Sequence, residues 1–142
     1  MTTVEFEVIG VPAPQGSKRH VGNGVMVESS KTLRPWRDSV AAAARDVANS
    51  IGDLAPLDGP LDLDVTFRFP MPASRPAAVR AVGIGPKVTA PDLDKLLRAI
   101  GDALEASGLV ANDARICSVT AEKFEVTGWT GAIVALTPGE TA

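Results

Sequence analysis

The chain has 142 residues, of which 45% are apolar and 22% are charged, as expected for one compact domain. Its net charge of −3 counts against a protein that holds nucleic acid by a large excess of positive charge. No apolar run approaches the roughly 20 residues that cross a bilayer. Residues 1–5 lack the basic and apolar segments of a signal peptide, so we expect a cytoplasmic protein with no membrane partner.

Positive charge is concentrated between residues 17 and 37, where Glu28 is the one acid. The cations of this segment are Lys18, Arg19, Lys31, Arg34 and Arg37. Such a basic island suits contact with phosphate groups, and a solvated loop is the other interpretation of the same charges. The sole histidine, His20, lies in this Gly-rich segment and is more typical of a solvated side chain than of a catalytic one.

The first part of the chain predicts a strand, a loop and a helix. Residues 3–11 alternate between apolar and polar side chains, which is the period of a strand with one wet face. A Pro- and Gly-rich loop follows, and residues 25–27 could form a short strand after a turn. Apolar residues then recur at helical spacing from about residue 31 or 35 to Ile51, with Trp36 as a core residue of that helix.

Residues 61–69 alternate most clearly and predict a strand whose wet face carries Asp62 and Asp64. These two acids could also bind a metal, but the wet face of a strand is the simpler interpretation. Residues 70–90 show no periodicity and are rich in Pro and Gly, so we interpret them as a mobile loop.

A second helix is expected from about Leu93, followed by a strand over residues 115–126. The apolar run 132–136 predicts a final buried strand that pairs with its predecessor as a hairpin. Cys117 excludes an intramolecular disulfide, and its apolar neighbours indicate a buried thiol. The elements together predict an α+β fold in one domain over residues 1–142, with a single mixed β-sheet and two main helices packed on it.

The second helix carries the chemistry that the sequence suggests. At about 100° per residue its leucines share one face, while Asp94 and Arg98 lie on the opposite face. Asp92 follows a proline and is expected at the N-cap, where its side chain can turn toward Asp94. Two adjacent carboxylates repel each other unless a cation neutralises them, and Mg²⁺ is the candidate cation. Helix capping is the alternative role of both residues.

A third acid, Asp113, lies beyond the end of this helix. The helix should be about 22 Å long, so the loop after Gly108 must turn back a long way to bring Asp113 to the first two acids within one chain. Asp113 could instead reach the site of a partner subunit. Ordinary turn chemistry is again the alternative role.

The block from residue 91 onward resembles the signature of the RusA family of Holliday junction resolvases. It reads Pro91-Asp92-Leu93-Asp94-Lys95-Leu96-Leu97-Arg98, followed by Asp102-Ala103-Leu104, Gly108-Leu109 and Asn112-Asp113-Ala114-Arg115-Ile116. The order of a first strand, a Pro-x-Pro loop, a basic segment and a helix around Trp36 is similar as well. The resemblance covers most of the chain, and its specific part is 91–116.

The resemblance implies roles for particular residues. The three metal-binding catalytic aspartates of the family fall on Asp92, Asp94 and Asp113, and its catalytic lysine falls on Arg98. The sequence departs from the family at Lys95, where the family has asparagine, and at Asn112, where it has an acid. An arginine can hold a phosphate but does not readily give up a proton, so either Arg98 or Lys95 could supply the catalytic cation.

The activity implied by the resemblance is Mg²⁺-dependent, structure-selective endonuclease activity that resolves Holliday junctions in DNA recombination and repair. A homodimer would make the two symmetric cuts in the branched DNA. The residues expected to contact DNA are Lys18, Arg19, Lys31, Arg34, Arg37, Lys87 and Lys95. The alternatives are a catalytically impaired protein that binds branched DNA and a dimeric scaffold.

Overall fold

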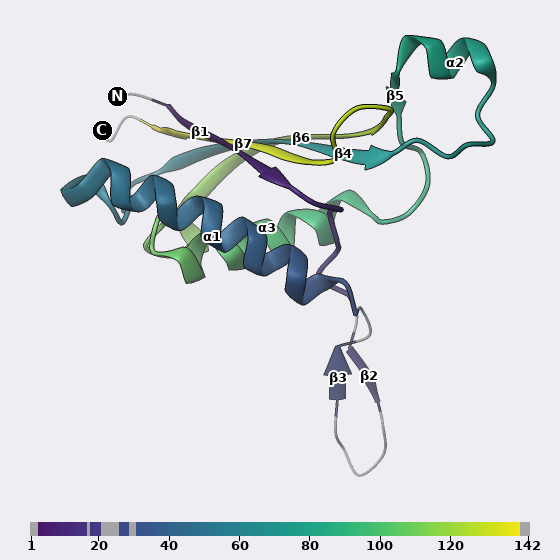
Figure 1. Ribbon diagram of the computed structural model, residues 1–142. Helices are drawn as coiled ribbons and strands as arrows, with labels where there is room; N and C mark the ends of the chain where they lie inside the picture. Colours follow the sequence, from purple (N-terminus) through teal and green to yellow (C-terminus); the bar gives the residue numbers. More distant parts are fainter. Residues whose placement is uncertain (1–2, 17, 21–25, 29–30, 140–142) are drawn as a thin grey trace.

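The computed structural model describes residues 3–16, 18–20, 26–28 and 31–139, with 18–20 and 26–28 described by their backbone. The described part contains two long helices, one short helix and seven strands (Figure 1). In chain order the elements are β1 (Val4–Ile9), β2 (Lys18–His20), β3 (Met26–Glu28), α1 (Leu33–Ile51), β4 (Leu61–Pro70), α2 (Ala77–Val82), β5 (Ile84–Pro86), α3 (Leu93–Ser107), β6 (Ile116–Val126) and β7 (Gly131–Pro138).

Five strands form one mixed sheet in the order β1-β7-β4-β6-β5, which confirms the predicted α+β class. The strands β4 and β6 run parallel, and the other neighbours in this sheet run antiparallel. The strands β2 and β3 form a separate two-stranded ladder that extends away from the sheet at the start of α1 (Figure 1). The predicted short strand at 25–27 is confirmed at residues 26 and 27, which belong to β3, and Val25 lies outside the described residues.

The predicted hairpin between the last two strands is wrong, because β7 lies between β1 and β4 and does not pair with β6. The apolar side chains of β7 are buried, including Val134 and Leu136, so this strand takes a central place in the sheet. Gly131 makes that place possible: its φ is +145°, and a Cβ at this residue would overlap the backbone carbonyl of Val8.

Helices α1 and α3 pack against each other and cover one face of the sheet (Figure 1). The core between these layers includes Trp36, Phe67 and Leu104, and the prediction that Trp36 is a core residue is confirmed. On the opposite face of β4, Asp62 and Asp64 are exposed, as expected of the wet face of a strand.

The segment 70–90 is not structureless, as the sequence suggested, because it contains α2 and β5. Strand β5 pairs with the end of β6, and the backbone N–H of Met71 donates a hydrogen bond to the Val126 carbonyl. The mobility of this segment stays a prediction. A second correction concerns Cys117, whose side chain is exposed on β6. Its neighbours did not predict this because β6 carries exposed residues on both faces at this end.

Candidate active site

The first two acids of the predicted site lie at the start of α3. Asp92 is the N-cap with extended backbone (φ −70°, ψ 143°), but its side chain makes no capping hydrogen bond. Asp94 lies in the first turn. Both side chains are exposed, and neither forms a hydrogen bond or an ion pair with any residue that the structure describes. Their carboxylate oxygens are therefore available to a cation.

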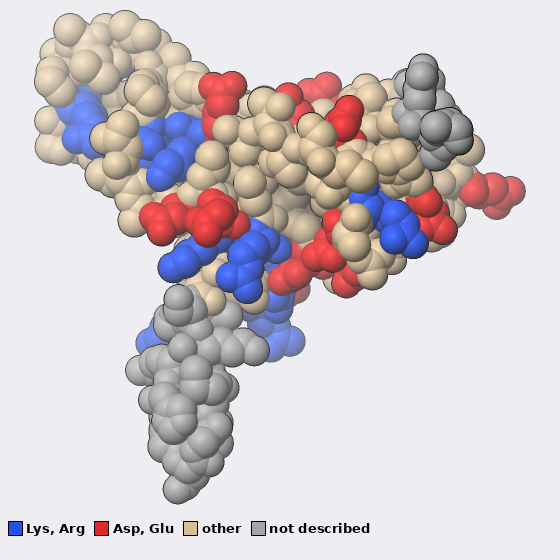
Figure 2. Space-filling view, turned by 180° about the vertical axis from the view of Figure 1, so that it is seen from behind, with Lys and Arg blue, Asp and Glu red and all other residues tan. Residues whose placement is uncertain are grey.

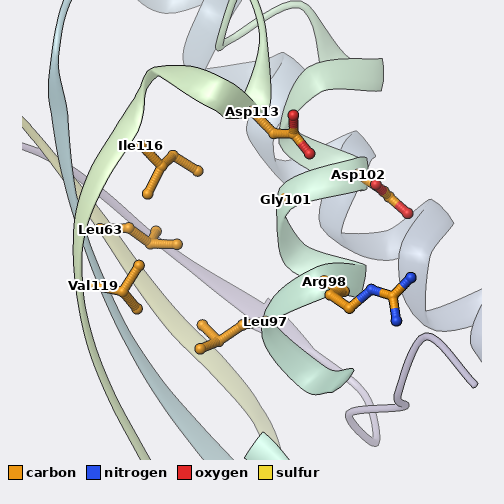
Figure 3. Close-up of a pocket in the computed structure, with 8 residues that line it drawn as sticks. All are labelled: Leu63, Leu97, Arg98, Gly101, Asp102, Asp113, Ile116 and Val119. Atoms are coloured by element: carbon orange, nitrogen blue, oxygen red, sulfur yellow. The ribbon is translucent and has the colours of Figure 1, made fainter. Parts of the chain in front are cut away.

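Helix α3 presents these acids because its other face is fixed in the core. Leu96, Ile100 and Leu104 are fully buried. The four-residue spacing therefore places Asp94, Arg98 and Asp102 along the outer face. Arg98 is exposed, Asp102 is half-buried, and both point away from the sheet (Figure 3).

Asp113 returns toward α3 after the helix ends. Gly108 ends the helix in the left-handed conformation (φ 83°), and Leu109 and Val110 are buried beyond it. A single 3₁₀ turn, η2 (Asp113–Arg115), then forms, with the Ala114 N–H donating to Asn112 Oδ1 at 2.8 Å. The Asp113 N–H donates to Glu105 Oε1 at 3.2 Å.

This turn brings Asp113 against the middle of α3 and not against its start. A Cβ at Gly101 would lie 3.7 Å from the Asp113 Cβ and 3.8 Å from its Oδ2. Asp113 and Arg98 are both among the residues that line a cleft of about 430 Å³ between α3 and β6, with the guanidinium of Arg98 directed away from the sheet (Figure 3). Its other lining residues are Leu63, Leu97, Gly101, Asp102, Ile116 and Val119.

The structure does not bring the three aspartates into one cluster within a single chain. Asp94 precedes Gly101 by seven residues, about 10 Å along the helix axis, whereas Mg²⁺ binds oxygen at about 2.1 Å. Within the described ranges, no three His, Cys, Asp or Glu side chains are grouped to hold one metal ion. The assignment of Asp92, Asp94 and Asp113 as joint metal ligands therefore stays a prediction.

Asp102 is a site residue that the sequence analysis did not single out. It lines the cleft with Asp113, and it also lines a neighbouring cleft of about 560 Å³ with Arg34 and Arg37. Its spacing of four residues from Arg98 was the available signal. The sequence analysis used this helical spacing for Asp94 and Arg98 and did not extend it to Asp102.

The predicted DNA-contacting cations lie in different places. Arg34 and Arg37 lie near the start of α1 and line a cleft with Asp102 and Glu105 of α3. Figure 2 shows a group of Lys and Arg side chains between groups of Asp and Glu at the lower middle of that view. The Gln15 N–H donates to the Lys95 carbonyl at 2.9 Å, and Arg37 Nη1 donates to Gln15 Oε1 at 3.3 Å. The loop after β1 therefore joins the two helices.

Three further cations differ in their surroundings. Lys31 is exposed and lines a small cleft beside Trp36. Lys87 lies over the Phe69 ring at 5.0 Å, and its Nζ donates to Thr89 Oγ1 at 3.1 Å. The side chains of Lys18 and Arg19 lie outside the described part of the chain, so their predicted role stays a prediction.

An ion pair fastens the segment before α3 to the sheet. Arg75 Nε and Nη2 donate to the two carboxylate oxygens of Glu125 at 2.8 and 2.9 Å. The Glu125 side chain is 6% exposed and that of Arg75 is 35% exposed. The hydrogen bonds from Arg75 hold the pKa of Glu125 below its ordinary value, although burial of the carboxylate opposes this shift.

This lowered pKa predicts a pH dependence of stability. The pair contributes stability that is fully present above the pKa of an unfolded glutamate, about 4.3. That contribution is lost as the pH falls through the lower pKa of the folded protein. We expect the free energy of unfolding of the wild type to fall more steeply than that of Glu125→Gln in this acidic range.

Urea titrations at several pH values measure this difference. Glu122→Gln is the matched control, because it removes an exposed glutamate of the same strand that has no ion pair in the described structure. If the free energy of unfolding fell equally steeply with pH in the wild type and in Glu125→Gln, the pH dependence could not be assigned to the Arg75–Glu125 pair.

Two comparisons with known proteins bear on this site. The family model for endodeoxyribonuclease RusA matches residues 9–136, which includes both long helices and the whole cleft. No curated protein matches the sequence. In addition, none of the helices in the described ranges is long and apolar enough to cross a membrane.

Proposed function

The chain belongs to the RusA family of endodeoxyribonucleases, and from this premise we propose that it is a Mg²⁺-dependent nuclease that resolves Holliday junctions by paired, symmetric incisions in recombination and repair. The observation that carries the proposal is the row of side chains along the outer face of α3. The carboxylates of Asp92 and Asp94, which have no partner among the described residues, are followed on α3 by the guanidinium of Arg98, and Asp113 of η2 packs against Gly101 of the same helix.

The residues at the start of α3 fit Mg²⁺. This ion is typically held by one or two carboxylates, several waters and phosphate oxygens of the substrate. Asp92 and Asp94 supply two exposed carboxylates without partners among the described residues. When bound there, Mg²⁺ would activate a water and stabilise charge on the scissile phosphate.

Arg98 is the better placed of the two candidate cations. It lines the cleft together with Asp113, whereas Lys95 does not. Its guanidinium can bind two oxygens of one phosphate and offset the negative charge that develops on them during cleavage. Lys95 is half-buried beside the loop after β1 and is positioned to contact the DNA backbone.

Substitution of these cations should separate their roles. We expect Arg98→Ala to slow single-turnover cleavage of a four-way junction by about a hundredfold or more, and Arg98→Lys to retain most of the rate. Lys95→Ala should mainly weaken DNA binding. It should also lower the slope of log affinity against log salt concentration by about one. Cleavage rates and binding at several salt concentrations measure both effects, and a larger loss of rate in Lys95→Ala would reverse the assignment.

DNA should approach from the helical side of the molecule. The face of the sheet that the helices leave uncovered carries the exposed acids Glu5, Glu7, Asp62 and Asp64. These carboxylates repel a phosphate backbone. The helical side instead presents Arg34, Arg37 and Arg98.

The edge of β6 supports the proposed homodimer. Strand β5 covers β6 only at residues 124–126, so residues 116–122 have no pairing partner on that side in the described structure. Residues 116–121 are uncharged, and an uncharged free edge is a template for another strand.

Two copies of this edge could pair around a two-fold axis. Asp113 lies just before β6. Antiparallel pairing would place the beginning of β6 in one copy beside the end of β6 in the other. Asp113 would then approach the partner's Asp92 and Asp94. Light scattering tests the dimer, and a monomeric mass at assay concentration would contradict it.

The second candidate is a catalytically impaired protein that binds branched DNA. It is favoured by Asn112, which replaces an acid of the family pattern and caps η2. Binding a labelled junction in EDTA and then adding Mg²⁺ distinguishes the two functions. The nuclease releases cut products after the addition, whereas the binding protein retains an intact junction.

A further inference from the structure

The side chain of Lys123, on β6, is bound to the segment that leads into α3. Its Nζ donates hydrogen bonds of 2.7 Å to the carbonyl oxygens of both Thr89 and Pro91. Pro91 immediately precedes Asp92, so this ammonium group is bonded to the residue next to the proposed metal-binding pair. Lys123 was not among the site residues that the sequence indicated.

Little else in the described structure fixes this segment. Val88, Thr89, Ala90 and Asp92 are all exposed, with Val88 at 86%. Apart from the bonds of Lys123, the hydrogen bonds of residues 88–92 are made within α3 or between the neighbours Lys87 and Thr89. The segment therefore has neither core packing nor a ladder of backbone hydrogen bonds to hold it.

The two acids depend on this segment to different degrees. Asp94 lies within α3, which Leu96 and Ile100 anchor in the core. Asp92 has extended backbone outside the helical turns. The position of Asp92 relative to Asp94 is consequently set by residues 89–91.

We propose that Lys123 is a positioning residue that orders residues 89–91 and thereby holds the Asp92 carboxylate beside that of Asp94 for a divalent cation. The inference rests on the proposed function for the role of the cation, but the ordering itself is a property of the chain without metal. Residues behind the direct ligands of a metal commonly change its affinity by about 10- to 100-fold.

Two variants and one control test the proposal. Lys123→Met removes the ammonium group and keeps an unbranched side chain, and Lys123→Arg keeps a donor cation. The control is Arg80→Met, because Arg80 Nη1 also donates to a backbone carbonyl, that of Pro72 at 2.8 Å, which lies outside residues 88–92.

Hydrogen exchange of the metal-free proteins measures the ordering directly. We expect Lys123→Met to exchange faster than the wild type at the amides of Lys87 and Leu96, which donate to the carbonyls of Lys123 and Asp92 at the two ends of the segment, while the amides of β4 and β7 stay protected. Lys123→Arg should restore much of this protection, and Arg80→Met should leave both amides unchanged. Unchanged exchange in Lys123→Met would overturn the proposal.

Calorimetric titration with Mg²⁺ measures the consequence for the site. We expect Lys123→Met to bind Mg²⁺ at least about tenfold more weakly than the wild type, with unchanged junction binding in EDTA. Equal Mg²⁺ affinity would overturn the role at the metal site. If the wild type neither binds Mg²⁺ nor cuts a junction, the proposed function fails, and hydrogen exchange alone then decides whether Lys123 orders the segment.

Discussion

Asp94→Asn is expected to reduce cleavage of a four-way junction by at least about a hundredfold, which corresponds to a loss of about 2.7 kcal/mol of transition-state stabilisation. The substitution removes one of the two carboxylates at the start of α3 that have no partner in the described part of the chain, and it keeps the size of the side chain. Its exposure predicts normal folding. Junction binding in EDTA should also persist, because a carboxylate does not attract a phosphate backbone.

Asp64→Asn is the matched control for this experiment. Asp64 is also an exposed aspartate, but it lies on the face of β4 that the helices leave uncovered. We expect this variant to cut at the wild-type rate. Undiminished cutting by Asp94→Asn, measured as single-turnover rates in Mg²⁺, would contradict the proposed site.

Gly131→Ala is expected to cause the largest loss of stability, at least about 4 kcal/mol. A Cβ at this residue would overlap the Val8 carbonyl and would require φ near +145°, which L side chains rarely adopt. Strands β1 and β7 would have to separate where Ile9 pairs with Gly131. Because small domains have only about 5–15 kcal/mol of stability, we expect low yields of folded protein.

Gly85→Ala is the control for the effect of adding a methyl group. A Cβ at Gly85 meets no atom within 4 Å, and Gly85 also lies in a strand. We expect its thermal unfolding midpoint to stay within a few degrees of that of the wild type. A Gly131→Ala protein as stable as Gly85→Ala would show that the close approach of β1 and β7 is not required.

The elements of the fold could be predicted because their patterns are local. The alternation over residues 61–69 and the helical spacing before Ile51 predicted β4 and α1 within about two residues. Strand neighbours depend on contacts distant in sequence, so β7 was paired with the wrong strand. The continuous apolar run of β7 was the available signal for a central strand.

The segment 70–90 shows a different limit of prediction. Its prolines and glycines indicated a loop, and they did not reveal α2 or β5. Tertiary contacts connect this segment to the sheet, chiefly the ion pair of Arg75 with Glu125 and the hydrogen bonds of Lys123. Those partners lie more than 30 residues apart in the sequence, so no local pattern shows them.

The candidate site was also predictable only in part. Positions on α3 follow from the helical repeat, so Asp94 and Arg98 were correctly placed on its outer face. The return of Asp113 depends on the buried Leu109 and Val110 and on the cap formed by Asn112. Sequence spacing could not show that Asp113 returns only as far as Gly101.

The most direct test of the central claim is the mapping of cuts that the wild-type protein makes in a four-way junction with each strand labelled in turn. We predict Mg²⁺-dependent nicks at symmetric positions in two opposing strands, no nicks in EDTA, and much slower cutting of a linear duplex of the same sequence. An intact junction after prolonged incubation with Mg²⁺ would contradict the account.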